Sequence, residues 1–355
     1  MFIQNISLIL LSISLIFFQS KYFILIDRPQ EQKHKLDYHK NIPLSGGIYF
    51  FLAFTANTLL TSYNQQNLIV VIFLLFFLTL GIYSDLKSDF SPKVRLFYQA
   101  VLVLTLIVLI DLNIDKTNIF FLDYLIHNHI FNLLFTFSCM LVLLNGSNFC
   151  DGINCNVSGY YLIVILAIFF SGLAIPDIFF QIENIIVIFS IFFIFNFLGK
   201  YFLGDNGVYI ISIFVSIYVI EFINFNNQAS SLLALNLLWY PAFENLFTII
   251  RRIVLKSKIQ VADRGHLHIL LFEKISKKIS IKISNSMSGI ILNLFMAIGI
   301  FTSIKYYNQN KILILILSLN ILTYVISYIL LKKSNFNLDK SIINETDNNI
   351  DSKNK

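Results

Sequence analysis

Long apolar runs separated by short polar segments make up most of the sequence. Eleven runs are long enough to cross a bilayer as helices, which takes about 17–25 residues each. Because backbone amides in lipid must be hydrogen-bonded within the segment, these runs predict helices and exclude open sheets. The pattern predicts an all-α integral membrane protein of about eleven spans, near residues 1–26, 46–62, 67–84, 95–112, 130–145, 158–175, 183–199, 207–224, 232–250, 287–307 and 311–331.

The composition supports the same class. Hydrophobic residues make up 57% of the chain and charged residues 13%, against about 25% charged residues in ordinary soluble domains. The first run lacks a basic start and a small-residue cleavage site, so we expect a retained span and not a cleaved signal peptide. We expect one polytopic domain over residues 1–331 and a polar, disordered cytoplasmic tail over residues 332–355.

The charges predict an orientation. Eleven spans divide the connecting segments into two alternating sets, and one set holds 23 of the 26 Lys and Arg residues. Because cytoplasmic loops are rich in Lys and Arg, that set is expected inside, with the amino terminus outside and the carboxyl terminus in the cytoplasm. The net charge of +6 is explained by this topology, so we expect no nucleic-acid partner.

Nearly every dense polar cluster falls on the predicted cytoplasmic side. This distribution is typical of a membrane protein whose active site lies in cytoplasmic loops and whose substrate arrives from that side. A channel, transporter or lipid flippase needs polar groups through the depth of the membrane. Most spans here consist of Ile, Leu and Phe, and Glu244 is the main exception. Glu244 therefore gives a transporter its only support.

Asp205 stands in the segment "FLGDNG", where one span ends and the next begins. Small neighbours leave backbone N–H groups open at the amino terminus of a helix, which favours a phosphate group. A carboxylate there is suited to hold Mg²⁺ against a diphosphate, since Mg²⁺ prefers oxygen ligands and keeps several waters. The alternative is a tight turn with a helix cap.

Four polar residues recur at every third position in "NGSNFCDGINCN", namely Asn145, Asn148, Asp151 and Asn154. On a helix or a 3₁₀ turn, this spacing places carboxamides and a carboxylate along one side. Carboxamides both donate and accept hydrogen bonds, so they suit a base edge, a sugar or a metal. The alternative is a polar loop rich in turn-forming residues.

Two further clusters carry charge. Asp85 lies in "SDLKSDFSPKVR" at the inner end of a span, where an acidic residue is not a typical interface anchor, although Lys and Arg nearby are. In "ADRGHLH", His266 and His268 share a face only if the segment is extended. Their spacing does not match a zinc helix, and with Arg264 they suit phosphate oxygens. The alternative is a basic loop that contacts anionic lipid.

Taken in order, these clusters resemble the polyprenyl-phosphate N-acetylhexosamine-1-phosphate transferase family. The resemblance covers about residues 27–270. It rests on "DRPQ" with "IPLSGG", "SDLKSDFSPKVRLFYQ", "NGSNFCDGIN", "NFLGKYFLGDNG" and "RR…ADRGHLH". The eleven-span layout resembles the N-acetylglucosaminyl branch. The muramoyl-pentapeptide branch has ten spans and three consecutive histidines, which this sequence lacks.

The resemblance implies a multi-pass enzyme of the bacterial cytoplasmic membrane that initiates cell-envelope polysaccharide synthesis. The phosphate of a polyprenol, undecaprenyl phosphate, attacks a UDP-N-acetyl sugar, and the products are polyprenyl-diphosphate-sugar and UMP. The implied cofactor is Mg²⁺, with Mn²⁺ as a substitute, and relatives suggest a homodimer. The alternatives are the phospho-N-acetylmuramoyl-pentapeptide transferase, a lipid transporter and a non-catalytic relative.

Residue by residue, the resemblance implies a catalytic set of Asp85, Asp205 and His268. It implies Asp205 and Asn148 as the Mg²⁺ ligands, and a set of substrate-binding residues comprising Asn145, Asp151, Asn154, Arg264, His266 and Lys40. Within that set, Asp151 and Asn154 contact the uridine side of the donor, and Arg264 and His266, with His268, hold the diphosphate and sugar. Lys40 or Lys35 binds the lipid phosphate.

The sequence also departs from the family pattern. The first member of the family's Asp-Asp pair is Ser84 here, which leaves the role of Asp85 open among base, ligand and organiser. Cys155 replaces a usual glycine, and Ile269 occupies the third histidine position. Glu244 stands where an aspartate is usual. Ser84 is the best argument for a non-catalytic relative.

Overall fold

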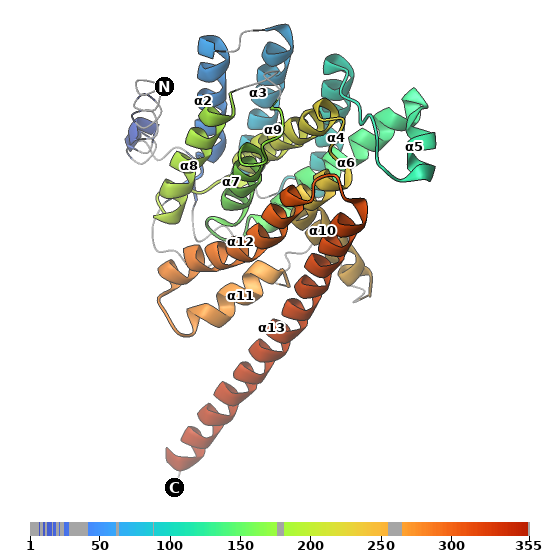
Figure 1. Cartoon of the computed structure of the whole chain (residues 1–355). Coiled ribbons are helices and arrows are strands. Elements are labelled where there is room, and N and C mark those ends of the chain that lie inside the picture. The colour runs from blue at the N-terminus through green and yellow to red at the C-terminus, as the bar shows by residue number, and fades with distance from the viewer. Residues whose placement is uncertain are drawn as a thin grey trace.

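The computed structural model describes residues 42–61, 64–87, 89–175, 181–254 and 265–353, together with a few positions between residues 7 and 27 (Figure 1). Side chains are described as far as residue 334. Within these ranges the chain is almost entirely helical. The prediction of an all-α membrane protein is confirmed.

Ten helices coincide with ten of the eleven predicted spans. They are α2 (Gly46–Thr61), α3 (Gln65–Leu86), α4 (Pro92–Ile110), α6 (His129–Cys150), α7 (Asn156–Phe169), α8 (Ile182–Phe197), α9 (Gly204–Phe225), α10 (Leu232–Val254), α12 (Ile281–Lys305) and α13 (Asn310–Lys353). Among the described residues, seven helices are long and apolar enough to cross a membrane, while α2, α7 and α8 are apolar but shorter. The first predicted span lies mostly outside the described residues, so the number of eleven stays a prediction.

Two short strands precede α2, and two short helices lie between the long helices. Strands β1 (Ile26–Asp27) and β2 (Ile42–Pro43) pair antiparallel and flank the segment that contains Lys40. Helices α5 (Phe120–Ile126) and α11 (Leu267–Ser276) lie in connections between spans. The sequence did not predict these elements, because each is too short to show an apolar period of its own.

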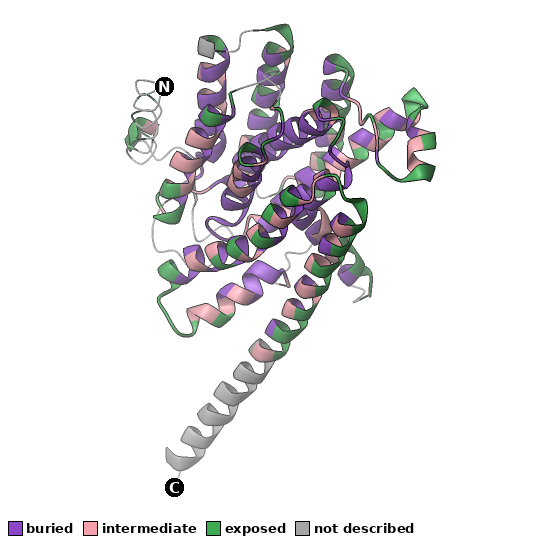
Figure 2. Cartoon of the chain, viewed as in Figure 1, coloured by how far each residue is buried: buried purple, intermediate pink, exposed green. Residues whose placement is uncertain are grey.

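Helix α9 occupies the centre of the fold and packs against α2, α3 and α6 (Figures 1 and 2). It is buried along nearly its whole length, as expected for a helix that is hydrophobic on all sides. Its hydroxyl groups are satisfied locally, since Ser212 and Ser216 donate to carbonyls one turn back. The surrounding helices therefore fix the position of its amino terminus.

Hydrogen bonds from β2 and α2 also hold the segment that leads into α9. The backbone N–H of Phe202 donates to Pro43 over 3.0 Å, and that of Gly46 donates to Phe202 over 3.2 Å. One residue further along α2, the N–H of Gly47 donates to Oδ1 of Asn206 over 2.7 Å. These contacts position Asp205 beside the start of α2.

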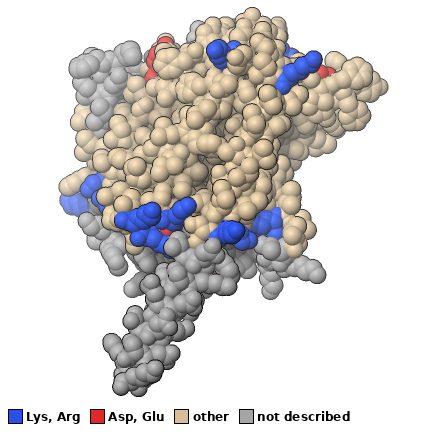
Figure 3. Space-filling view, turned by 60° about the horizontal axis from the view of Figure 1, so that its bottom comes forward, with Lys and Arg blue, Asp and Glu red and all other residues tan. Residues whose placement is uncertain are grey.

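Lys and Arg residues gather along the lower edge of the molecule in Figure 3, at one end of the helix bundle. Few of them stand at the opposite end in that view. The assignment of this end to the cytoplasm stays a prediction. The predicted disorder of residues 332–355 also stays a prediction, because side chains beyond residue 334 lie outside the description.

Candidate active site

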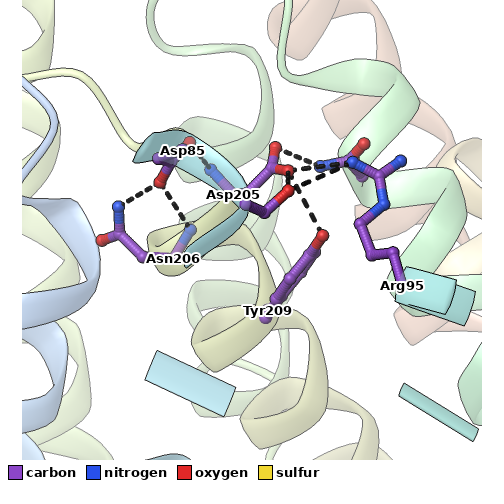
Figure 4. Close-up of polar contacts among 7 residues, drawn as sticks. Asp85, Arg95, Asp205, Asn206 and Tyr209 are labelled. Atoms are coloured by element: carbon purple, nitrogen blue, oxygen red, sulfur yellow. Dashed lines mark hydrogen bonds and ion pairs between the residues drawn. The ribbon is translucent and has the colours of Figure 1, made fainter. Parts of the chain in front are cut away.

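The side chain of Asp205 is the meeting point of four hydrogen-bond donors (Figure 4). Oδ1 accepts from the carboxamide of Asn148 over 2.7 Å. Oδ2 accepts from Ser84 Oγ over 2.6 Å, from Arg95 Nη1 over 3.0 Å and from Tyr209 Oη over 3.3 Å. Helices α3, α4, α6 and α9 each supply one donor. Three other helices therefore converge with α9 itself on one carboxylate.

The hydrogen bonds of Asp85 go to the first residues of α9 and not to the carboxylate of Asp205. Its Oδ1 accepts from the N–H of Asp205 over 3.0 Å, and its Oδ2 accepts from the N–H of Asn206 over 3.1 Å and from the carboxamide of Asn206 over 2.5 Å. The first N–H groups of a helix lack partners within the helix, and an acidic side chain nearby also stabilises the positive end of the helix dipole. Asp85 thus caps α9 from a neighbouring helix.

Two glycines make this arrangement possible. Gly204, the first residue of α9, has φ of +68°, in the left-handed region that glycine adopts at little cost. A side chain at Gly81 on α3 would overlap the backbone of Asn206, since an added Cβ would lie 2.3 Å from its Cα. Gly81 therefore allows the close approach of α3 that brings Asp85 to the start of α9.

Arg95 and Tyr209 were missed as site residues by the sequence analysis. Arg95 forms an ion pair with Asp205 in which both side chains are about one-quarter exposed, whereas its position after Pro92 pointed to an interface anchor. Tyr209 lies one turn after Asp205 on α9, and the i, i+4 spacing was a usable signal. Both side chains are aimed at the Asp205 carboxylate in Figure 4.

The predicted row of polar residues on α6 continues only to the end of that helix. Asn148 contacts Asp205, and Asn145 donates to Leu141 within α6 over 3.0 Å. Because α6 ends at Cys150, Asp151 is its C-cap. Asn154 is buried and turned toward α12, where its N–H and carboxamide bond Asn285 and Ser286. The expectation that one side carries all four residues is wrong for Asn154.

His266 and His268 stack on each other with ring centroids 5.5 Å apart. His266 is the extended N-cap of α11 and His268 lies in its first turn, so the change in backbone conformation brings two residues at i, i+2 together. Phe149, next to Asn148 on α6, also stacks with His266, with 5.8 Å between the ring centroids. The histidines are therefore connected to the same helix that contacts Asp205.

The two histidines have different surroundings. His266 is 2.8 Å from the buried carboxylate of Glu244, measured from Nδ1 to Oε1. His268 is buried against Gly152, and its Nδ1 has no hydrogen-bond partner among the described residues. Burial, with a smaller contribution from His266, lowers the pKa of His268 well below its usual value. His268 is therefore neutral near pH 7.

Two predicted substrate-binding residues, Lys40 and Arg264, lie outside the described residues, as does Lys35. Arg252, at the end of α10, stands over the ring of Phe149 at 5.9 Å. The buried side chain of Arg252 faces the same ring as His266. In the sequence, Arg252 was noted only as part of the motif "RR…ADRGHLH". In the described part of the site, Arg95 contacts Asp205, and Arg252 contacts the ring with which His266 stacks.

The oxygen donors around Asp205 fit a magnesium ion. Within the described residues no group of three or more His, Cys, Asp or Glu side chains is close enough to hold a metal. Magnesium does not need such a group, because it is usually held by one or two protein ligands together with waters and substrate phosphates. The Asp205 carboxylate is 23% exposed, and Asn148 would offer its carboxamide oxygen after a flip of the amide.

Two comparisons relate the chain to known proteins. Residues 67–223, from α3 to α9, match the family model for glycosyl transferase family 4. Over 253 residues, covering 68% of each chain, the protein is 26% identical to the probable undecaprenyl-phosphate N-acetylglucosaminyl 1-phosphate transferase of Bacillus subtilis (strain 168). The matched stretch includes Asp205 and the residues that donate to it.

Proposed function

Because the chain belongs to glycosyl transferase family 4, we propose that it transfers an N-acetylhexosamine-1-phosphate from a UDP-sugar to undecaprenyl phosphate. The name of the Bacillus subtilis relative gives N-acetylglucosamine as the first sugar to test. The products are undecaprenyl-diphosphate-sugar and UMP. Such an enzyme is a sugar-1-phosphate transferase of the bacterial cytoplasmic membrane.

The reaction exchanges one phosphorus–oxygen bond for another. An oxygen of the lipid phosphate forms a bond to the β-phosphorus of the UDP-sugar. The bond from that phosphorus to the bridging oxygen breaks, and UMP leaves with the oxygen. A phosphate monoester is mostly dianionic near pH 7, since its second pKa is about 6. The acceptor therefore needs no strong base, and Ser84 in place of an aspartate is compatible with turnover.

The observation that carries the proposal is the convergence on Asp205. Phosphoryl transfer depends mainly on positioning and on stabilisation of negative charge. Asp205 and Asn148 would hold Mg²⁺, which when bound neutralises charge on the diphosphate. Arg95 keeps the Asp205 carboxylate in place over 3.0 Å. The expected open N–H groups at the start of α9 are not available to a phosphate, because those of Asp205 and Asn206 donate to Asp85.

The histidine pair supports binding of the donor on the other side of α6. His266 is held by Glu244 through Nδ1, and His268 is neutral with no partner on its Nδ1 among the described residues, so each ring keeps a nitrogen for a hydrogen bond with the donor substrate. Asp151 is the C-cap of α6. It directly precedes Gly152, which His268 contacts. We assign this region to the sugar and nucleotide portions of the donor.

The test measures UMP release by the full-length protein, purified in detergent, with undecaprenyl phosphate and a panel of UDP-N-acetyl sugars, with and without Mg²⁺. The variant Asp205→Asn keeps the size of the side chain and removes its charge. The matched control is Asp111→Asn, a carboxylate at the far end of α4 that bonds only Asn113 in the described structure.

Release of UMP that requires Mg²⁺, is lost in Asp205→Asn and survives in Asp111→Asn is the expected result. It would also identify the sugar. Absence of release from every donor by folded protein would reject the proposal and favour a non-catalytic relative, for which Ser84 is the supporting feature. Release that is equal in both variants would remove Asp205 from the site.

A further inference from the structure

Glu244 is a carboxylate that the proposed reaction does not use directly. It lies on α10 three residues after Pro241, with no exposed surface. A buried carboxylate is costly unless hydrogen bonds and opposite charge compensate for lost solvation. Its burial inside α10 therefore calls for partners that hold it.

Both oxygens of Glu244 have such partners. Oε1 is 2.8 Å from Nδ1 of His266, at the start of α11. Oε2 accepts from the hydroxyl of Tyr324, on α13, over 2.5 Å. Tyr324 donates to Oε2, and an ionised carboxylate only accepts, so an ionised Glu244 takes its hydrogen bond at Oε1 from the Nδ1–H of His266. Three helices that follow the family-matched stretch are joined through one carboxylate.

The orientation of the Tyr324 hydroxyl is fixed by its surroundings. Its ring packs edge-on against Phe243 and Phe247 of α10, with centroids 5.0 and 5.3 Å away.

The ring of His266 has further contacts. On α10, one turn beyond Glu244, the hydroxyl of Thr248 lies 3.5 Å from Nδ1 of His266. The ring of His266 also stacks with both Phe149 and His268. The imidazole therefore has little freedom to rotate.

From this geometry we propose that Glu244, supported by Tyr324, is a positioning residue that keeps the proton of His266 on Nδ1. Nε2, which has no partner among the described residues, is then an acceptor for a hydroxyl group of the sugar, and it donates to diphosphate oxygens only when the ring is protonated. A carboxylate behind a histidine fixes the tautomer and the ring orientation of the imidazole and raises its basicity. The substrate-facing part of this proposal rests on the proposed function, whereas the tautomer does not.

The first experiment reads the tautomer directly, without substrate. The chain has six histidines, so the full-length protein labelled with ¹⁵N-histidine gives a small set of ring signals. The signals of His266 are assigned by their loss in His266→Gln. We expect a protonated, hydrogen-bonded Nδ1 in the wild type. In Glu244→Gln the Nδ1–H fraction should fall, since neutral imidazole without this partner no longer favours that tautomer.

The matched control is Asn236→Leu. Asn236 is also a buried polar residue of α10 that bonds α13, through the carbonyl of Leu313 over 3.1 Å, but it has no bond to a histidine. It should leave the His266 signals unchanged. Unchanged signals in Glu244→Gln, or equal changes in Asn236→Leu, would overturn the proposal whatever the enzymatic activity is.

Kinetics with the UDP-sugar then separate positioning from general packing. Loss of a residue that orients a functional histidine costs about 10- to 100-fold in activity, and loss of the one hydrogen bond in Tyr324→Phe should cost about two- to tenfold. Glu244→Asp should restore part of the loss. The double variant Glu244→Gln with His266→Gln should be no worse than His266→Gln alone, because residues that act through one another are not additive. Additive losses would contradict action through His266.

Discussion

The carboxylate of Asp85 accepts a hydrogen bond from the backbone N–H of Asp205, with 3.0 Å between Oδ1 and N. The two acidic side chains do not face each other. Asp85 binds the start of the α9 backbone, and Asp205 faces Arg95, Asn148 and Ser84. From these contacts we propose that the two aspartates differ in role: Asp85 organises the turn that carries Asp205, and Asp205 presents its carboxylate to the site.

The first prediction concerns Asp85→Asn. The carboxamide keeps one acceptor for the α9 N–H groups, so we expect a loss of about 1 kcal/mol in stability, as for other helix caps. Because Asp85 acts as an organiser, the affinity for Mn²⁺, measured by electron paramagnetic resonance, should stay within about threefold of the wild type. A loss of Mn²⁺ binding as large as that in Asp205→Asn would make Asp85 a metal ligand instead.

The second prediction concerns Arg95→Gln. This change removes a charge-assisted hydrogen bond to Asp205, and such bonds contribute about 1.5–3 kcal/mol. We expect kcat/KM for UMP release to fall about 10- to 100-fold, because 1.4 kcal/mol corresponds to a factor of ten. The control is Lys93→Gln, since Lys93 is exposed on the same helix turn. Equal losses in the two variants would show that only the local surface charge matters.

The helices could be predicted from the sequence and much of the site could not. Long apolar runs identify spans because lipid leaves the backbone no other structure, and ten helices stand where the runs predict them. Asp205 and Asn148 were found because each stands in a dense polar cluster at a span end. Arg95 joins them only through tertiary packing of α4 beside α3 and α6, which periodicity does not contain.

Asn154 illustrates a different limit. Spacing of three residues indicates a shared side only while the helix continues, and α6 ends at Cys150. The chain then turns through Cys155 in the left-handed region, and Asn154 is directed toward α12. The end of a helix is set by capping and by neighbouring helices, so a residue pattern that crosses it predicts less than the same pattern within it.

The third prediction concerns Ser84→Asp. Oγ of Ser84 lies 2.6 Å from Oδ2 of Asp205, so an aspartate there would place a second carboxylate beside the first. Two adjacent carboxylates repel each other, and a divalent cation relieves the repulsion. We expect Mn²⁺ to bind about tenfold more tightly than in the wild type, about 1.4 kcal/mol. Ser84→Ala is the control and should leave Mn²⁺ affinity nearly unchanged. Weaker Mn²⁺ binding in Ser84→Asp would contradict the prediction.

The fourth prediction concerns Cys155, whose φ of +64° is unfavourable for a residue with a side chain. Left-handed backbone costs about 1–2 kcal/mol per residue that is not glycine. Cys155→Gly and Cys155→Ala both lose the buried thiol, but only glycine removes the backbone cost. We expect Cys155→Gly to be more stable than Cys155→Ala by about 1 kcal/mol, measured as the difference in Tm in one detergent. An alanine variant as stable as the glycine variant would show that the strain is not significant.

The last prediction uses the pKa of His268, which burial lowers below its usual value. The unfolded chain then binds a proton near pH 6.5 that the folded chain does not bind until a lower pH. The contribution of His268 to the free energy of unfolding should therefore be constant above about pH 6.5 and should decrease as the pH falls below about 6.5. His268→Gln removes the group, so its Tm should decrease less than that of the wild type between pH 7.5 and pH 5.5. His127→Gln, at an exposed position in the connection between α5 and α6, is the control and should decrease as the wild type does. If His268→Gln is as acid-sensitive as His127→Gln, other groups govern the response and His268 is protonated without loss of stability.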